Sequence, residues 1–355
     1  MDFQVRRDDI HQVRFEDSEP PELEAGEALL GIDRFGITTN NITYAVMGDA
    51  MRYWEFFPAE DGWGRIPVWG FATVAASACE GVEEGQRFYG YLPPADHLVV
   101  KPSRVDRQGF VDAAPRRASL PSAYQGYRRT DTDPIYEERH EGRQILLWPL
   151  YYTSWLIDDF LADSEFFGAG IAILSSASSR TSSALAYPLS KRKGIEVIGL
   201  TSPRNAEFVE GLGCYDRVVT YEGIESLERE PAVYVDMAGD AKVSSAVHGH
   251  FGDELKHSAA VGVTHRDELG GGAELAGPKP EFFFAPTWIT KRVSDWGGEA
   301  LNERVAADWR PYVEWTEGWL TVERGSGPEE IERVYREVLD GRSDPAVGHV
   351  LSPGD

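Results

Sequence analysis

The sequence predicts an α/β fold with two parts, a β-rich domain and a doubly wound parallel sheet. Three observations predict it. Residues 171–204 have the pattern of a strand, a turn, a helix and a second strand, which is a βαβ unit. Strand and helix patterns then alternate to residue 263, as is typical of a parallel sheet covered by helices. Residues 1–110 instead contain short strand patterns between Gly and Pro turns, which favours a small barrel-like domain.

In the N-terminal part, each predicted strand is a short apolar stretch bounded by turn residues. These strands cover residues 27–32, 68–76, 85–91 and 97–100. Residues 103–145 are rich in Arg, Asp and Pro and are predicted to be a connector. A helix is predicted over residues 148–160, where aromatic and aliphatic residues recur on one side.

The elements after the first βαβ unit continue the alternation of strands and helices. Strands are predicted over residues 217–221, 232–236 and 257–263, with a helix over residues 244–250. A Gly/Pro-rich break follows, and a last strand is predicted over residues 281–285. The remaining elements are predicted to be a helix, a strand, an amphipathic helix and a final strand, over residues 300–314, 319–324, 328–339 and 348–351.

The turn of the first βαβ unit has serine where a dinucleotide-binding turn has glycine. Ser176, Ser179 and Ser182 occupy the three glycine positions. Serine can donate a hydrogen bond to a phosphate, but it lacks the freedom of glycine at positive φ. An ordinary strand–helix corner is an equal alternative. The candidate cofactor-binding residues of this turn are Ser176, Ser178, Ser179, Arg180 and Thr181.

The second strand of the unit ends without an acidic residue. Thr201, Ser202 and Arg204 stand where an NAD-binding strand usually ends in Asp or Glu, which binds the ribose 2′-hydroxyl. Hydroxyls and a guanidinium suit a 2′-phosphate instead. If a dinucleotide binds, the sequence therefore favours NADPH. Ser202 and Pro203 are also a good helix cap and first helical residue, and the two roles are compatible.

The composition excludes several classes of partner. The chain has 355 residues and a formal net charge of −24, and its acidic residues are scattered. This argues against nucleic acid and anionic membrane surfaces as partners. No apolar run is long enough to span a membrane and no signal region is present, so a cytoplasmic location is expected. The acidic composition resembles that of proteins from salt-rich cytoplasm.

Four stretches occur in an order that matches a known family. They are GITTNNITYAVMG at residues 36–48, VEEGQRFYG at 82–90, RNAEFVEGLGCYD at 204–216, and a helix and strand at 323–348. The chain resembles the medium-chain dehydrogenase/reductase superfamily over nearly its whole length. The resemblance is closer to the zinc-free quinone oxidoreductase and enoyl reductase branches, and closest to a little-characterised subgroup without an assigned reaction.

The resemblance implies a domain organisation. A GroES-like β-rich catalytic domain is expected over residues 1–145, and a Rossmann-type dinucleotide-binding domain over residues 146–285. Residues 286–355 are expected to be a return segment that completes the catalytic domain.

No metal site is expected. Thr38, Thr39 and the run Trp69-Gly70-Phe71 occupy the places of the ligands in the zinc branch. His97 has no partner at ligand spacing, and the two cysteines are far apart.

The resemblance also places the candidate catalytic residues in the stretch at residues 36–48. The enoyl reductases carry an active-site tyrosine in this loop, so Tyr44 is the candidate donor of a proton to a carbanion or enolate. Asn40 or Asn41 would hold a carbonyl oxygen in the same site. The alternative is that Tyr44 is a packed aromatic and that the two asparagines form a turn.

Further candidates line the predicted substrate and cofactor sites. Trp54, Phe57 and Trp69 belong to an aromatic cluster that would wall a pocket for an apolar or aromatic substrate. Barrel core and subunit contact are the alternatives for this cluster. Arg128 and Arg129 would recognise an acidic group or be surface charges. The remaining cofactor candidates are Thr153, at the place of a family threonine near the cofactor, and Val263 and Thr264, at the end of a late strand.

We expect a zinc-independent, NADPH-dependent reductase of a small α,β-unsaturated carbonyl compound or a quinone. The nicotinamide would supply the hydride. The alternative is a non-catalytic dinucleotide-binding or scaffold protein of the same fold, which the serine-rich turn favours. A hydrolase is less favoured, because the turn lacks the G-x-S-x-G pattern. A homodimer is expected through the apolar strand at residues 281–285, which needs cover.

Overall fold

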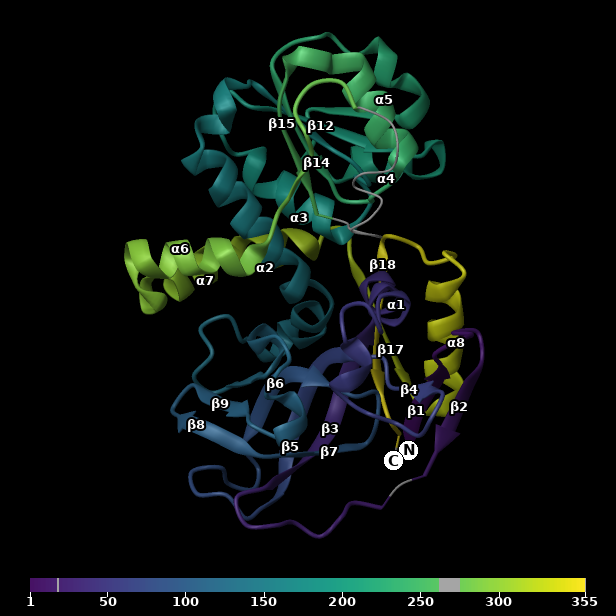
Figure 1. Ribbon diagram of the computed structural model, residues 1–355, viewed down its shortest axis with the longest axis vertical. Coiled ribbons are helices and arrows are strands. Elements are labelled where there is room, and N and C mark those ends of the chain that lie inside the picture. Colours follow the sequence, from purple (N-terminus) through teal and green to yellow (C-terminus); the bar gives the residue numbers. More distant parts are fainter. Residues whose placement is uncertain (18, 262–274, 355) are drawn as a thin grey trace. The chain divides into compact units, whose positions relative to one another are not determined.

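The chain folds into two compact units (Figure 1). The structure, a computed structural model, describes residues 1–17, 19–261 and 275–354. The first unit consists of residues 1–148 and 320–355, and the second of residues 149–319. The second unit is thus inserted into the first.

The return to the first unit occurs later in the chain than the predicted boundary at residue 286. Residues 286–319 belong to the second unit. Arg292 is buried there and pairs with Asp159, and the Tyr312 ring stacks on Tyr151 with a centroid distance of 4.5 Å. These long-range contacts fix the segment, and no local pattern in the sequence reports them.

Strand β3 (Ala28–Ile37) is the central strand of the first unit. It pairs with β5 (Val68–Ser77), β7 (His97–Val100) and, near its end, β18 (Val347–Ser352). The main sheet has the order β17-β18-β3-β5-β6-β10-β9-β8. Its remaining strands are β6 (Arg87–Leu92), β8 (Pro102–Asp106), β9 (Gly109–Asp112), β10 (Gly126–Arg129) and β17 (Thr321–Ser326). A smaller sheet has the order β2-β1-β4 and contains β1 (Asp2–Arg6), β2 (Val13–Glu16) and β4 (Trp63–Gly64).

The predicted connector at residues 103–145 contains three strands, β8, β9 and β10. The prediction missed them because they are only four or five residues long and few of their residues are apolar. Phe110 in β9 and Tyr127 in β10 are buried partners on neighbouring strands. Their rings stack with a centroid distance of 5.0 Å. Arg104 and Asp106 of β8 are exposed and belong to the charged residues that suggested a connector, whereas Asp112 and Arg117 are buried and paired with each other.

Two helices complete the first unit, α1 (Thr39–Val46) and α8 (Pro328–Leu339). The amphipathic pattern predicted for α8 is present, since Ile331, Val334, Tyr335 and Val338 are buried. The Tyr335 ring contacts Phe3 edge-on at 5.2 Å. In Figure 1, α8 (yellow) accordingly lies beside the N-terminal strands β1 and β2 (purple). The last helix of the chain therefore packs into the core that the first strand begins.

The second unit is built on a six-stranded parallel sheet with the order β13-β12-β11-β14-β15-β16. In chain order this is 3-2-1-4-5-6, the order of a Rossmann-type sheet. The central strands β11 and β14 are buried at every position. The predicted doubly wound α/β class is confirmed. The strands are β11 (Ile171–Leu174), β12 (Glu196–Thr201), β13 (Arg217–Thr220), β14 (Ala232–Asp236), β15 (Leu255–Ala260) and β16 (Glu281–Phe282).

The helices of the second unit are largely as predicted, with one exception. The strand predicted over residues 281–285 has only two residues, and α6 begins at Ala285, with Pro286 in its first turn. Helix α2 contains the boundary between the units. No helix among the residues described above is long and apolar enough to cross a membrane. The helices are α2 (Glu141–Asp163), α3 (Arg180–Leu189), α4 (Ala206–Gly211), α5 (Ala241–Phe251), α6 (Ala285–Trp296) and α7 (Gly298–Thr316).

Candidate functional site

The serine turn between β11 and α3 follows the backbone path of a glycine-rich turn. Ser176 has a φ of 51°, in the left-handed region that favours glycine. The next residue, Ala177, donates its N–H to the Leu200 carbonyl at 2.9 Å. A Cβ atom on Gly199 would lie 2.9 Å from the Ala177 side chain, so this glycine lets the turn pack against β12. The turn therefore contains a left-handed residue and packs closely on β12 although it contains no glycine.

Most hydroxyls of the turn make contacts within the protein. Ser179 caps α3, and its Oγ accepts from the Ser182 N–H at 3.1 Å. The Ser182 hydroxyl contacts Tyr215 at 3.1 Å, and Ser178 Oγ accepts from the Asn205 amide at 3.0 Å. An anion at this turn would consequently meet the backbone N–H groups at the start of α3, which have no partner inside the helix.

The ends of β12 and β13 form the part of the site that suits a 2′-phosphate. Thr201 is buried, Ser202 is half-buried, and Arg204 is exposed. The Arg204 side chain has no hydrogen bond or ion pair with any described residue. Tyr221 follows β13. Burial raises the pKa of its phenol, and the Ser176 backbone N–H acts to lower this pKa.

Tyr221 was missed by the sequence analysis, although a signal was present. Thr201 and Thr220 are partners in the parallel register of β12 and β13. The residue after Thr220 therefore lies beside the end of β12, where the cofactor candidates had been placed.

The structure also brings an unpredicted carboxylate to the turn. Asp236 ends β14 and accepts from the Ser175 hydroxyl at 2.8 Å and from the Ser244 hydroxyl at 2.7 Å. The Ser175 oxygen in turn accepts from the Met237 N–H at 2.9 Å. This network joins the loop after β14 to the serine turn, at the point where the strand order of the sheet reverses. The sequence could have indicated this residue, because Asp236 ends an apolar run that was predicted to be a strand.

The other cofactor candidates that the structure describes have polar groups that are partly buried or hydrogen-bonded within the protein. Arg180 is half-buried beside Tyr312, and burial lowers the pKa of its guanidinium to about 10. Thr153 lies in α2, and its hydroxyl donates to the Pro149 carbonyl at 3.3 Å. The Thr181 carbonyl accepts from Ser154, which ties α2 to the first turn of α3. Val263 and Thr264 lie outside the described residues.

In the first unit, Tyr44 is part of a buried hydroxyl cluster on α1. Asn40 Nδ2 donates to the Tyr44 oxygen at 2.7 Å, and Trp69 Nε1 donates to it at 3.4 Å. Only 5% of Tyr44 is exposed, and this burial raises the pKa of its phenol well above the ordinary value. The structure thus brings together three of the predicted residues, Tyr44, Asn40 and Trp69.

Asn41 has a different role from the one predicted. Its Oδ1 accepts from the Thr38 N–H at 2.7 Å and from the Thr38 hydroxyl at 3.0 Å. Its Nδ2 donates to the Pro67 carbonyl at 2.8 Å. The amide is buried, and these contacts fix the start of α1.

Two of the three predicted pocket residues are core residues. Trp54 fills the space beside Gly48 and Gly64, where a Cβ atom would lie 2.0 Å and 2.5 Å from its indole. Phe57 is buried with the Arg117 guanidinium 4.7 Å above its ring. Only Trp69 is half-buried, and its ring stacks on Tyr89 at 5.6 Å. Core packing, the alternative weighed above, therefore describes Trp54 and Phe57.

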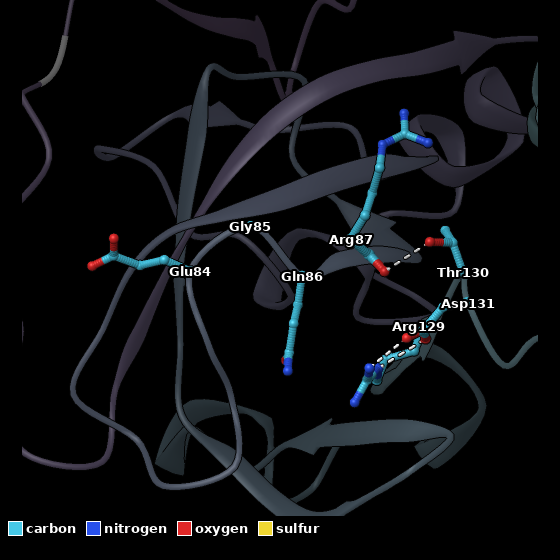
Figure 2. Close-up of a pocket in the computed structure, with 7 residues that line it drawn as sticks. All are labelled: Glu84, Gly85, Gln86, Arg87, Arg129, Thr130 and Asp131. Atoms are coloured by element: carbon cyan, nitrogen blue, oxygen red, sulfur yellow. Dashed lines mark hydrogen bonds and ion pairs between the residues drawn. The ribbon is translucent and has the colours of Figure 1, made fainter.

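A surface pocket of about 380 Å³ lies elsewhere in the first unit, between β6 and β10 (Figure 2). Its two arginines are paired locally: Arg129 with Asp131, and Arg87 with Asp33 and Glu141. Arg128, on the opposite face of β10, pairs with Asp133 at 2.8 Å. Figure 2 shows Arg129 turned toward Asp131. The lining contains none of the predicted catalytic or cofactor residues.

Metal ligands are not gathered at any place that the structure describes. In the described ranges, no three His, Cys, Asp or Glu side chains are arranged to hold a metal ion.

A family model described as "Protein of unknown function (DUF2855)" matches residues 35–344. No curated protein matches the sequence. Among solved structures, the chain is similar to CurA from Vibrio vulnificus in complex with NADPH, with a TM-score of 0.61 and 14% identity over 97% of this chain and 94% of that one. It is also similar to YhdH from E. coli K-12 with bound NADPH, with a TM-score of 0.55 and 15% identity over 100% of both chains. A third is the YhdH oxidoreductase from Salmonella enterica in complex with NADP, with a TM-score of 0.54 and 16% identity over 96% of this chain and 95% of that one.

These similarities settle the fold. The similar structures are oxidoreductases of the medium-chain dehydrogenase/reductase superfamily, with a GroES-like and a Rossmann-type domain. The predicted resemblance is therefore confirmed at the level of the fold.

Proposed function

The chain belongs to the family described as "Protein of unknown function (DUF2855)", and we propose that it is a zinc-independent, NADPH-dependent oxidoreductase. Its substrate would be a small α,β-unsaturated carbonyl compound or a quinone. The fold supports the proposal, since the similar CurA and YhdH structures contain NADPH. The site supports it further, because the residues at the carboxyl edge of the second unit's sheet fit this cofactor.

One observation carries the choice of cofactor. Arg204 is exposed at the end of β12 and makes no ion pair with any residue in the described ranges. Ser202 and Tyr221 place hydroxyl groups at the ends of the same two strands. A cation beside hydroxyl groups is suited to a 2′-phosphate, and no carboxylate takes the place that would bind the 2′-hydroxyl of NADH.

The proposed chemistry divides the work between cofactor and protein. NADPH, when bound, supplies a hydride. The serine turn and the N-terminus of α3 would hold its pyrophosphate, and Arg204 its 2′-phosphate. Tyr44 would give a proton to the carbanion or enolate that hydride addition creates. Asp236 and Ser175 would keep the turn in shape.

The test is a fluorescence titration with NADPH and NADH at high salt. Arg204→Ala should weaken NADPH binding about 10- to 100-fold, because a charge-assisted contact is lost, and leave NADH binding unchanged. Arg217→Ala is the matched control. Arg217 is also exposed, but it begins β13 and so lies at the amino end of the strands, away from Arg204. Failure of wild type to bind either nucleotide would overturn the proposal.

The alternative is a non-catalytic dinucleotide-binding or scaffold protein. The strained serine at position 176 and the burial of Tyr44 favour it. NADPH binding without oxidation of NADPH by any enone or quinone in a broad panel would support this alternative over the reductase.

We also propose a homodimer. The strand β16 is at the edge of the described sheet, and Phe282 and Phe284 are exposed there, at 43% and 55%. Val293 of the adjoining helix α6 is exposed as well, at 43%. An apolar sheet edge of this kind needs cover, and a second copy of the chain would provide it.

A further inference from the structure

The oxygen of Tyr44 has two hydrogen-bond donors directed at it. Asn40 lies one helical turn before Tyr44 on α1, and its Nδ2 is 2.7 Å from the phenol oxygen. Trp69 reaches the same oxygen from β5, with its Nε1 at 3.4 Å. The two donors come from different elements, so the phenol is held from two directions.

The direction of the Trp69 contact is fixed by chemistry. An indole N–H can only donate, so the Tyr44 oxygen must be the acceptor. The Asn40 amide donates in the same sense. With both donors directed at its oxygen, the phenol keeps its own O–H for a third partner. Hydrogen bonds of active sites are often long in the free protein and shorten as charge develops, which fits the 3.4 Å distance.

We propose that Asn40 and Trp69 are positioning residues that aim the Tyr44 proton at the substrate and stabilise the phenolate that proton transfer leaves. This rests on the proposed role of Tyr44 as the acid. In that step the O–H bond of Tyr44 breaks, a new bond to hydrogen forms on the substrate carbanion or enolate, and the electron pair stays on the Tyr44 oxygen. The hydride of NADPH has already supplied the electrons that reduce the substrate.

This role replaces the one expected for Asn40, which was to hold a carbonyl oxygen of the substrate. It also explains how a buried phenol can act as an acid. Burial raises the pKa of Tyr44, whereas the hydrogen bonds from Trp69 and Asn40 lower it. Donors to the charged form favour ionisation.

The rings around the site allow the donors to be removed without disturbing the packing. Trp69 stacks on Tyr89 at 5.6 Å and contacts Tyr91 at 5.0 Å. Phe in its place would keep an aromatic ring on Tyr89 and Tyr91 and lose the N–H together with the smaller ring of the indole. Asp in place of Asn40 would keep the shape and replace the donor by an acceptor, which would draw the Tyr44 proton away from the substrate.

The experiment is ¹⁹F NMR of the full chain with fluorotyrosine incorporated, which brings phenol titration into an accessible pH range. The Tyr44 resonance is assigned by its absence in Tyr44→Phe. Trp69→Phe should raise the titration midpoint of this resonance by about one pH unit, as expected for loss of one hydrogen bond to a charged group. Asn40→Asp should raise it by more, because it also places a carboxylate beside the phenolate. Trp63→Phe, an exchange of a tryptophan that does not touch Tyr44, should leave it unchanged.

The outcomes separate this inference from the proposed function. If Tyr44→Phe abolishes NADPH-dependent reduction but neither variant moves the midpoint, the positioning role is overturned and Tyr44 remains the acid. If Tyr44→Phe reduces the same enones and quinones as wild type, both the acid and its positioning residues are overturned. A shifted midpoint together with a kcat about 10-fold lower at unchanged KM supports the inference.

Discussion

At the scale of single residues, the most informative position is Ser176. Its φ of 51° is a conformation that a residue with a Cβ atom adopts at a cost of about 1–2 kcal/mol. The strain persists because neighbouring contacts hold the turn in place. The Ala177 N–H is hydrogen-bonded to β12, and Gly199 has no side chain to occupy the space that the turn needs. The turn therefore has a backbone conformation that favours glycine at position 176, but the residue there is serine.

This strain leads to a prediction about stability. Ser176→Gly should stabilise the protein by about 0.5–1 kcal/mol, since the gain in the folded state exceeds the added freedom of the unfolded chain. Ser178→Gly is the matched control, because Ser178 lies in the same turn without a positive φ. It should destabilise by about 0.5–1 kcal/mol. Urea denaturation of both variants checks this, and equal destabilisation by both would contradict it.

The place of a single residue in the fold could be predicted from sequence where the local chain decides its environment. The position of Arg204 follows from the end of an apolar strand and the absence of an acid after it. Asn41 could not be assigned in this way, because its partner Pro67 lies 26 residues further along the chain. Trp54 and Phe57 were misplaced for the same reason, since long-range packing decides whether an aromatic ring lines a pocket or fills a core.

At the scale of elements, burial on both faces explains which strands were predictable. β11, β12 and β14 are apolar runs in the middle of a sheet, and the sequence located each of them. β8, β9 and β10 are edge or near-edge strands with polar alternate residues, and they were read as a connector. Helix α6 was not predicted, because it begins at Ala285, inside the stretch that was predicted to be a strand.

The short edge strand β16 allows a prediction about assembly. Exchanging Phe282 and Phe284 together for lysine should convert a dimer into a monomer, because charge at an apolar sheet edge opposes pairing. Light scattering coupled to gel filtration in 2 M KCl gives the mass directly. Val46→Lys alters an equally exposed apolar residue of α1 and should leave the mass unchanged. A monomeric wild type would contradict the proposed dimer.

At the scale of the whole molecule, the net charge of −24 sets the electrostatic conditions for folding. Many acidic side chains are paired in the structure, as in the Arg292 group with Asp159, Asp163 and Asp295. The surplus remains as mutual repulsion, which the folded state concentrates in a smaller volume than the unfolded chain does. Salt screens this repulsion over about 10 Å at 0.1 M and about 3 Å at 1 M.

The melting temperature should therefore rise with ionic strength. Between 0.1 and 2 M KCl we expect an increase of roughly 2–4 °C for each kcal/mol of repulsion relieved. Sucrose at equal osmolality is the control for solvent exclusion and should give a smaller rise. Calorimetry checks this. A melting temperature that does not change with KCl would show that repulsion among the acidic side chains does not destabilise the fold.

The insertion of residues 149–319 into the first unit has a consequence for biosynthesis. Strand β18 pairs with β3, and α8 supplies Tyr335 to the core around Phe3, yet both are translated only after the whole second unit. At 5–20 residues per second, the ribosome needs roughly 20–70 s to finish a chain of this length. During that time the nascent chain exposes an unfinished β-sheet edge. The first unit is therefore complete only after β18 has been made, and a chain that ends before β18 would leave this edge of β3 unpaired.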